Sequence, residues 1–243
     1  MKALILAAGL GTRLRPLTNT IPKPLLPIAG KPLLQYHLDQ LTKHGVNDVL
    51  INTHYLPEKI STYIDEYGSM HDEMNIVTSF EETLLGSAGS LKMNQDFFST
   101  EEDFFIVYGD NLTDIDYTTL MDYHKSKGGL VTIAGYREEH PEQKGVIEYA
   151  SDARITRFVE KPGPGETTSS IANAGIYVIN KKIFAYLSKL NTPVLDFGYD
   201  LFPYLLEKDE DLYMYTMTEI VLDIGTHENY HKASTLLKST TLR

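Results

Sequence analysis

Apolar residues along the first half of the chain follow two alternating patterns. The continuous apolar runs KALILAA (2–8), DVLINT (48–53) and FFIVYGD (104–110) are typical of strands that are buried on both faces of a sheet. In PLLQYHLDQLTKH (32–44) the apolar residues recur at helical spacing, and the pattern stops at Gly45. This alternation of strands and helices predicts an α/β fold with a doubly wound, mainly parallel sheet.

The alternation continues up to Tyr136 and then loosens. Beyond that residue, short strand-like segments follow one another with little helix between them, which predicts small antiparallel additions to a mixed sheet. The segments expected to form these additions are KGVIEYA (144–150), RITRFVE (154–160) and AGIYVIN (174–180). Further strands are expected at LYMYTM (212–217) and IVLDIG (220–225). Helices are expected around 181–189, 197–207 and 226–238.

Composition excludes several classes of protein. The 243 residues contain no cysteine, so disulfides, zinc–thiolate sites and cysteine nucleophiles are excluded. No apolar stretch approaches the roughly 20 residues that span a bilayer, and the N-terminal apolar run is too short for a signal peptide. We therefore expect a cytoplasmic protein with no membrane partner.

Charge is distributed unevenly along the chain. The net charge of −11 argues against a nucleic-acid partner, because phosphate neutralisation supplies most of that affinity. Residues 1–38 nevertheless contain only basic charges, namely Lys2, Arg13, Arg15, Lys23 and Lys31. A basic segment in an acidic protein indicates a site for a small, strongly anionic ligand, although chance clustering would give the same pattern.

The basic segment includes a glycine-rich loop, GLGTRLRPLT (9–18), directly after the first predicted strand. Leu14 stands where a dinucleotide-binding fingerprint has its third glycine, and the Gly-Lys-Ser/Thr of a P-loop is absent. Lys23 lies between Pro22 and Pro24, which restrict the backbone around it. The planar guanidinium of Arg13, the compact ammonium charge of Lys23 and the backbone N–H groups of the loop could together bind a polyphosphate.

This loop and five later segments resemble the sugar-1-phosphate nucleotidylyltransferase family. The opening LAAGLGTRLRPLT…IPKPLLPIAGKPLL is similar to the family motif G-x-G-T-R-(x)-x-P-x-T, which is followed by a Pro-Lys lysine. The later segments that resemble the family, in its order, are ETLLGSAGSL (82–91), VYGDN (107–111), FVEKP (158–162), NAGIYVI (173–179) and VLDIGTHENY (221–230). Six segments in the right order make coincidence a poor explanation.

The resemblance implies a Rossmann-like, GT-A-like nucleotidyltransferase domain over residues 1–243. Its nucleotide-binding half would cover about 1–136 and its sugar-binding half about 137–243. The implied reaction joins a nucleoside triphosphate and a sugar 1-phosphate and yields a nucleotide sugar and pyrophosphate. We expect a short form without the C-terminal β-helix of many relatives, and a homodimer is compatible with this reading.

The resemblance also implies the roles of particular residues. The residues expected to be catalytic are Arg13, Lys23 and Asp110. Those expected to bind the nucleotide are Leu6, Ala7, Ala8, Gly9, Gly11, Thr12, Arg13, Lys23, Glu81 and Gly86. Those expected to bind the sugar phosphate are Asn111, Gly145, Glu160, Lys161 and Asn173. Asp110 and Asp223 each end an apolar run at the ligand-binding edge of the sheet, so we expect them to hold Mg²⁺.

The sequence specifies the base and the sugar of the substrates less closely than it specifies the reaction. A carboxylate of Glu81 or Glu82 can accept hydrogen bonds from N1–H and N2–H₂ of guanine, whereas thymidylyl and uridylyl members of the family usually carry glutamine there. This favours GTP, with mannose 1-phosphate as the first sugar. Asn111 resembles the thymidylyl branch, so a thymidylyl- or uridylyltransferase acting on glucose, heptose or muramic acid 1-phosphate is the alternative, and a phosphocholine acceptor is a distant one.

Two rival functions are weaker. A catalytically silent, nucleotide-sugar-binding regulatory subunit would be expected to lose the lysine or one aspartate, and this chain keeps Lys23, Asp110 and Asp223. A dinucleotide-binding oxidoreductase is disfavoured by Leu14. The sequence therefore favours an Mg-dependent enzyme of nucleotide-sugar biosynthesis.

Overall fold

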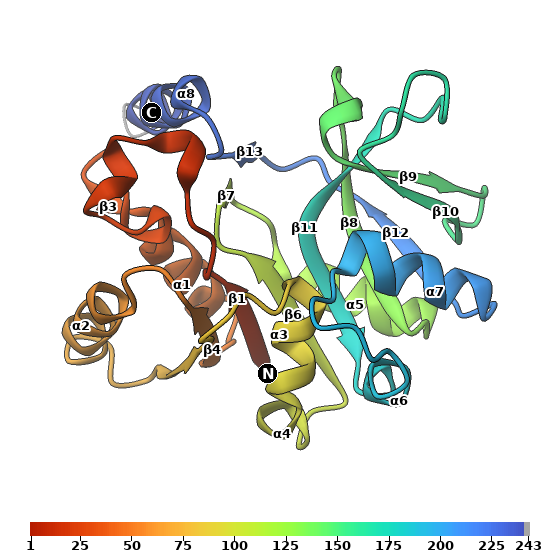
Figure 1. Cartoon of the computed structure of the whole chain (residues 1–243), viewed down its shortest axis with the longest axis horizontal. Helices are drawn as coiled ribbons and strands as arrows, with labels where there is room; N and C mark the ends of the chain where they lie inside the picture. Colours follow the sequence, from red (N-terminus) through yellow and green to blue (C-terminus); the bar gives the residue numbers. More distant parts are fainter. Residues whose placement is uncertain (241–243) are drawn as a thin grey trace. The chain divides into compact units, whose positions relative to one another are not determined.

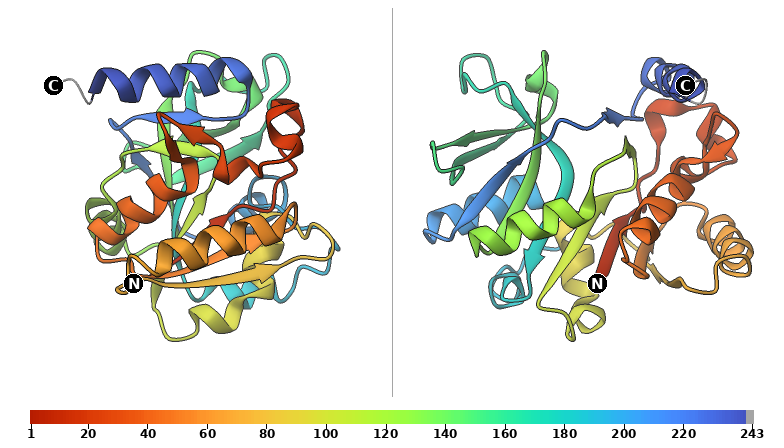
Figure 2. Two further views of the ribbon diagram at one scale, coloured as in Figure 1. Left: turned by 90° about the vertical axis from the view of Figure 1, so that its left-hand side faces the viewer. Right: turned by 180° about the vertical axis from the view of Figure 1, so that it is seen from behind.

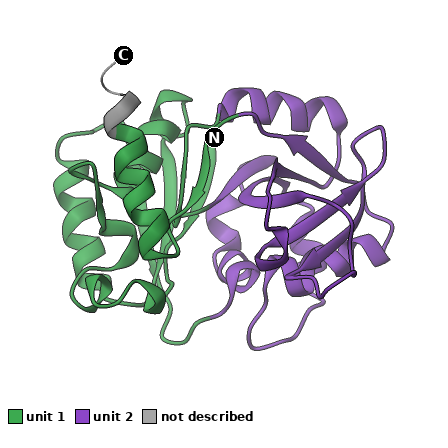
Figure 3. Cartoon of the chain, turned by 90° about the horizontal axis from the view of Figure 1, so that it is seen from above, with its two compact units in different colours: residues 1–84, 108–115, 219–243 green, residues 85–107, 116–218 purple. Residues whose placement is uncertain are grey.

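The chain folds into two units, each built from segments that are separate in the sequence (Figure 3). The computed structural model describes residues 1–240. Unit 1 consists of Met1–Leu84, Tyr108–Ile115 and the segment that begins at Glu219. Unit 2 consists of Leu85–Val107 and Asp116–Thr218.

A parallel three-stranded arrangement forms the centre of unit 1. Strand β4 pairs with β1 on one side, from Lys2↔Asp48 to Leu6↔Asn52, and with β5 on the other. The helices α1 and α2 lie beside these strands (Figure 1) and connect them along the chain. The bounds are β1 Lys2–Leu6, α1 Leu33–Lys43, β4 Asp48–Thr53, α2 Pro57–Gly68 and β5 Asn75–Phe80. The carboxyl ends of β1, β4 and β5 therefore meet at one edge.

Short elements complete unit 1 around that edge. Strand β7 pairs with β13 in an antiparallel ladder, and β2 pairs with β3. Helix α8 contacts both β2 and β13 (Figure 2). The bounds are η1 Thr12–Leu14, η2 Leu17–Asn19, η3 Lys23–Leu25, β2 Pro27–Ile28, β3 Lys31–Pro32, β7 Asn111–Thr113, β13 Val221–Asp223 and α8 His227–Thr240, where η1, η2 and η3 are 3₁₀ helices.

Unit 2 is dominated by antiparallel pairing. Strand β11 is antiparallel to β6, β8 and β9, and β9 is antiparallel to β10, while β12 runs parallel to β8. The strands are β6 Asp103–Tyr108, β8 Val131–Arg137, β9 Gly145–Tyr149, β10 Ile155–Glu160, β11 Ile171–Asn180 and β12 Leu212–Thr216. The helices are α3 Ser87–Met93, α4 Gln95–Phe98, α5 Tyr117–Lys127, the 3₁₀ turn η4 Pro141–Gln143, α6 Ile183–Leu187, the π-helical turn η5 Phe197–Leu201 and α7 Phe202–Glu207.

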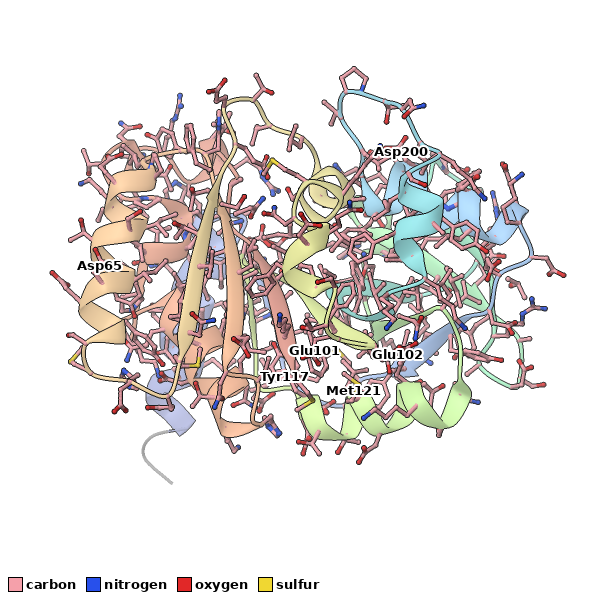
Figure 4. All side chains as sticks on the ribbon, turned by 90° about the horizontal axis from the view of Figure 1, so that it is seen from below. Asp65, Glu101, Glu102, Tyr117, Met121 and Asp200 are labelled. Carbon is pink, nitrogen blue, oxygen red and sulfur yellow. The ribbon has the colours of Figure 1, made fainter. Side chains whose placement is uncertain are left out.

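Helix α5 shows how the sequence sets an element and its burial. The side chain of Asp116 accepts a hydrogen bond from the Thr119 N–H at 2.8 Å and so caps the first turn. Gly128 ends the helix in the left-handed conformation at φ 67°. Tyr117 and Met121, labelled in Figure 4, belong to the face that is buried. The helix thus has both ends specified locally and one apolar face buried.

The predicted α/β fold is confirmed: the sheet is mixed, with parallel strands in unit 1 and extensive antiparallel pairing in unit 2. Three short strands that the sequence did not indicate are present, namely β2, β3 and β7. The halves at about 1–136 and 137–243 are functional assignments and stay predictions, and residues 241–243 lie outside the described residues. Across residues 1–240, no helix combines the length and the apolarity that crossing a bilayer would require.

Removal of the α5 cap should destabilise the fold. We expect Asp116→Ala to lower the free energy of unfolding by about 1 kcal/mol, because the Thr119 N–H loses its side-chain acceptor. Asp122 is exposed on the same helix and provides the matched control. Asp122→Ala should change the free energy of unfolding by less than about 0.5 kcal/mol. Urea unfolding followed by far-UV circular dichroism measures both, and equal losses would contradict the capping role.

Candidate active site

The glycine-rich loop leaves β1 and turns back at Gly11. Gly11 has φ +62°, and a Cβ there would lie 3.0 Å from Thr18 Cγ2 and 3.3 Å from Lys23 Cβ. The Thr18 hydroxyl donates a hydrogen bond to the Gly11 carbonyl at 2.8 Å. Only glycine fits both the backbone conformation and this close approach. The loop is thus seated directly on the segment that carries Lys23.

Lys23 is a largely buried cation. It begins the 3₁₀ helix η3, and its side chain is 9% exposed. Its Nζ donates a hydrogen bond to Asp110 Oδ2 at 2.7 Å and lies 3.9 Å from Asp223 Oδ1. A buried ammonium is stabilised only by nearby negative charge, and the two carboxylates provide it.

The ladder between β7 and β13 brings the two aspartates together. Asp223 is paired in register with Asn111, the residue that follows Asp110. The Ile224 N–H donates to the Asp110 carbonyl at 2.8 Å, and the Asn229 side chain donates to the Asp223 carbonyl at 2.8 Å. The backbone therefore fixes both carboxylates, although they are far apart in the sequence.

One apolar cluster anchors every segment that carries these groups. It combines residues from the loop, from the stretch after Lys23, from α1, from β7, from the turn after β13 and from α8. Its buried members are Leu14, Leu26, Ile28, Leu33, Leu112, Ile224 and Ala233. Because each segment contributes a buried side chain, a shift of one segment would cost packing in the others.

Arg13 joins this group through Gly225. A Cβ on Gly225 would lie 2.8 Å from Asp223 Oδ1 and 2.9 Å from an Arg13 guanidinium nitrogen, so both side chains flank this buried glycine. Arg13 itself is exposed. The structure thus brings together four predicted site residues within unit 1: Arg13, Lys23, Asp110 and Asp223.

The donor set fits a magnesium ion. Asp110 and Asp223 offer hard oxygen ligands, and the Lys23 ammonium already stands as a cation beside both carboxylates. Among the described residues, no group of three or more histidine or acidic side chains could hold a metal ion. The chain would therefore supply two carboxylates, with water and phosphate oxygens as the remaining ligands.

His37, on α1, supports the strand end that carries Asp110. The side chain is 2% exposed, and its ring is hydrogen-bonded to the backbone of Gly109. Burial lowers the pKa of His37 to about 4, against a smaller opposing effect of the Asp110 charge. The imidazole is therefore neutral at neutral pH. Sequence reasoning gave His37 no role, because a lone histidine on a helix carries no chemical signal.

A second buried polar group lies at the same edge of unit 1. Asn52 and Glu81 are 3% and 2% exposed. Asn52 Oδ1 accepts a hydrogen bond from the Ala7 N–H at 2.6 Å, and Asn52 Nδ2 donates to Glu81 Oε1 at 2.8 Å. The predicted nucleotide-binding residues Ala7 and Glu81 are therefore linked through Asn52. A polar residue inside the apolar run DVLINT was the signal that could have identified it.

Two of the predicted sugar-binding residues meet in unit 2. Glu160 and Gly145 are paired in register between β10 and β9. A Cβ on Gly145 or on Gly198 would lie 2.6 Å or 2.5 Å from Glu160 Oε2, so the carboxylate occupies space that only glycines leave. Burial raises the pKa of Glu160, and the nearby Asp196 charge raises it further.

The other predicted sugar-binding residues belong to different elements. Asn173 donates to the Tyr177 hydroxyl at 2.8 Å and accepts from the Gly175 N–H at 2.9 Å. Lys161 follows β10 and is exposed. Asn111 is buried in β7 of unit 1, next to Asp110.

Gly86 has a structural reason of its own to be glycine. It lies in unit 2 at φ +80°, and a Cβ would come within 2.5 Å of the Leu195 carbonyl oxygen. That carbonyl accepts the N–H groups of Ala88 and Gly89, each at 2.9 Å. The start of α3 is therefore fixed against Leu195, and a side chain at residue 86 would separate them.

Comparison with known proteins identifies the family to which the chain belongs. The family model described as nucleotidyl transferase matches residues 2–240. A UTP–glucose-1-phosphate uridylyltransferase from Synechocystis is 36% identical over 96% of this chain and 62% of its own length. A mannose-1-phosphate guanyltransferase from Saccharomyces cerevisiae is 33% identical over 97% of this chain and 64% of its own length. The chain thus spans about three-fifths of these relatives.

A solved structure shows the same fold. The crystal structure of a putative glucose-1-phosphate thymidylyltransferase from Bacillus anthracis superimposes with a TM-score of 0.87, at 24% identity, over 97% of this chain and 94% of that one. At this identity the likeness concerns the fold alone, whereas the family model covers nearly the whole sequence. The chain therefore belongs to the nucleotidyl transferase family.

Proposed function

We propose that this protein transfers a nucleotidyl group from a nucleoside triphosphate to a sugar 1-phosphate. The observation that carries the proposal is the meeting of Lys23 with both Asp110 and Asp223, beside a glycine-rich loop and Arg13. Relatives named as a uridylyltransferase and a guanyltransferase of sugar 1-phosphates support it.

The reaction needs charge neutralisation and alignment more than proton transfer. A phosphate oxygen of the sugar 1-phosphate forms a bond to the α-phosphorus, and the bond from that phosphorus to the bridging oxygen breaks, which releases pyrophosphate. The attacking phosphate is already anionic at neutral pH, so no general base is required. In transfers of this kind, positioning and electrostatic stabilisation supply most of the rate.

The residues of unit 1 would hold the triphosphate. The loop of residues 6–12 and Glu81 would form the nucleotide site of unit 1, while Gly86, which belongs to unit 2, stays in the proposed set of nucleotide contacts. Arg13 and Lys23 would neutralise charge on the α-phosphate and the leaving pyrophosphate. Asp110 and Asp223 would bind Mg²⁺, which supplies charge compensation to the phosphates when bound.

The residues of unit 2 would hold the sugar phosphate. The exposed ammonium of Lys161 suits the phosphate, whereas Glu160 and Asn173 offer acceptors and a donor for hydroxyls. Gly145 would act by leaving the space that the Glu160 carboxylate occupies, since a Cβ there would lie 2.6 Å from Glu160 Oε2. Asn111, although it belongs to unit 1, stays in the proposed set of sugar-phosphate contacts.

GTP and mannose 1-phosphate are the proposed substrates. The guanyltransferase relatives support them, while the uridylyltransferase relative supports UTP and glucose 1-phosphate as the alternative. A regulatory subunit without catalysis is the weaker alternative, because Lys23, Asp110 and Asp223 are all retained and brought together. A cytoplasmic location and a homodimer complete the proposal.

Substrate identity is tested by pyrophosphate release. We expect the purified protein with Mg²⁺ to release pyrophosphate fastest from GTP and mannose 1-phosphate, in a panel that pairs GTP, UTP, dTTP, CTP and ATP with mannose, glucose and heptose 1-phosphates. A higher kcat/KM for another pair would replace this substrate assignment. No release with any pair, together with tight binding of a nucleotide sugar, would favour the regulatory subunit.

The metal-binding role is tested by removing one charge at a time. We expect Asp110→Asn and Asp223→Asn each to lower kcat by about a hundredfold or more, because the amide is a much poorer ligand for Mg²⁺. Circular dichroism should stay unchanged, since the amide keeps the size of the side chain. Near-normal turnover in either variant would remove that residue from the site.

Gly225 provides a gentler disturbance of the same site. In Gly225→Ala the new methyl group would displace Asp223 and Arg13, so the Mg²⁺ concentration for half-maximal rate should rise by about tenfold. Gly68→Ala is the control, because a Cβ at Gly68 meets nothing within 4 Å. An unchanged Mg²⁺ requirement in Gly225→Ala would show that Asp223 does not hold the metal as proposed.

A further inference from the structure

Asn52 lies at the place where the three parallel strands of unit 1 end. It is paired in register with Leu6 of β1 on one side and with Ser79 of β5 on the other. Its side chain spans from the first amide after β1 to the carboxylate just after β5, through bonds of 2.6 Å and 2.8 Å. The contacts Ala7–Asn52–Glu81 thus link the carboxyl ends of all three strands, and Ala7 lies two residues before the glycine-rich loop.

The direction of these hydrogen bonds is determined by Ala7. A backbone N–H can only donate, so Asn52 must present Oδ1 to it, which turns Nδ2 toward β5. There Nδ2 requires an acceptor, and the Glu81 carboxylate accepts it. Buried polar groups are costly unless each is satisfied, so the two hydrogen bonds support each other.

Glu81 itself is held firmly from its own backbone. Its N–H donates to the Thr53 carbonyl at 2.8 Å, and its carbonyl contacts His54 Nδ1 at 2.8 Å. The residue is 2% exposed, whereas the neighbouring Glu82 is exposed. The Glu81 carboxylate therefore lies within the protein interior, bonded to the side chain that accepts the Ala7 N–H.

We infer that Glu81 is a positioning residue, which acts through Asn52 on the backbone at Ala7 and does not read the edge of the base. The inference rests on the proposed function, because it concerns how the same nucleotide site is held. Its consequence is that base selectivity originates in other groups, and that the pair sets the geometry of the loop for every nucleotide alike.

A change of Glu81 to glutamine separates the two roles. If the carboxylate accepted from both N1–H and N2–H₂ of guanine, the amide could replace only one acceptor, and GTP alone would suffer. In a positioning role, the amide that replaces the carboxylate still offers Oε1 to Asn52. We expect Glu81→Gln to keep the ratio of kcat/KM for GTP to that for UTP, with mannose 1-phosphate as the common acceptor, within about threefold of wild type.

An exchange of the two side-chain types tests the coupling. Asn52→Asp places two carboxylates against each other and should lower kcat/KM for both nucleotides by about tenfold or more. The double variant Asn52→Asp with Glu81→Gln restores both bonds, since the new amide donates to the new carboxylate and that carboxylate also accepts from the Ala7 N–H. The double variant should therefore recover most of the loss.

Asn75 offers a matched control at the other end of the same two strands. There Asn75 Nδ2 donates to Asp48 Oδ1 at 2.8 Å, in an exposed pair. Asn75→Asp introduces the same repulsion away from the loop and should leave kcat/KM within about twofold of wild type. Thermal unfolding of all variants separates a loss of stability, which leaves the kinetics of the folded fraction unchanged, from a loss of positioning.

Three results would overturn the inference. They are a shift of the GTP-to-UTP ratio by about tenfold or more in Glu81→Gln, a double variant no better than Asn52→Asp, and unchanged kinetics in Asn52→Asp. Failure of the proposed function is a different outcome, because the wild type would then turn over no substrate pair. In that case the ratio of dissociation constants for GTP and UTP, measured by calorimetry on the same variants, decides between the two roles.

Discussion

The site depends on one electrostatic constraint, the compensation of two neighbouring carboxylates by a single buried ammonium. Asp110 and Asp223 both lie within 4 Å of Lys23 Nζ, at 2.7 Å and 3.9 Å. Without a cation between them, two such carboxylates would repel each other. The Lys23 ammonium therefore offsets this repulsion and holds the pair in place.

The constraint is met because the surrounding structure is stiff. The prolines on either side of Lys23 limit the backbone of η3, and the β7–β13 ladder fixes the carbonyls beside both aspartates. The apolar cluster that includes Leu14, Leu112 and Ile224 packs these segments against one another. Catalytic groups that are held by packed neighbours lose little entropy when a substrate binds, which is the usual advantage of preorganisation.

The sequence was informative where a local pattern decides the structure. The apolar run 48–53 became β4 with those same bounds, because a strand whose side chains are nearly all buried needs no other signal. Strand β7 has only three residues, Asn111–Thr113, and forms through pairing with a distant segment, so no local pattern could indicate it. The charged site residues were identifiable through motifs, but their meeting could be seen only in three dimensions. Asn52 shows the limit most clearly, since its partners are 45 and 29 positions away along the chain.

The same ladder has a consequence for biosynthesis. It pairs Asn111 with Asp223, so the two halves of the carboxylate pair leave the ribosome at widely separated times. Before the segment that carries Asp223 is synthesised, Asp110 and Lys23 can already form their ion pair. The apolar cluster is still incomplete at that stage, because Ile224 and Ala233 are missing from it. A nascent chain of this protein therefore brings Lys23, Asp110 and Asp223 together only in one late step, and the apolar surface around Leu112 stays exposed until that step.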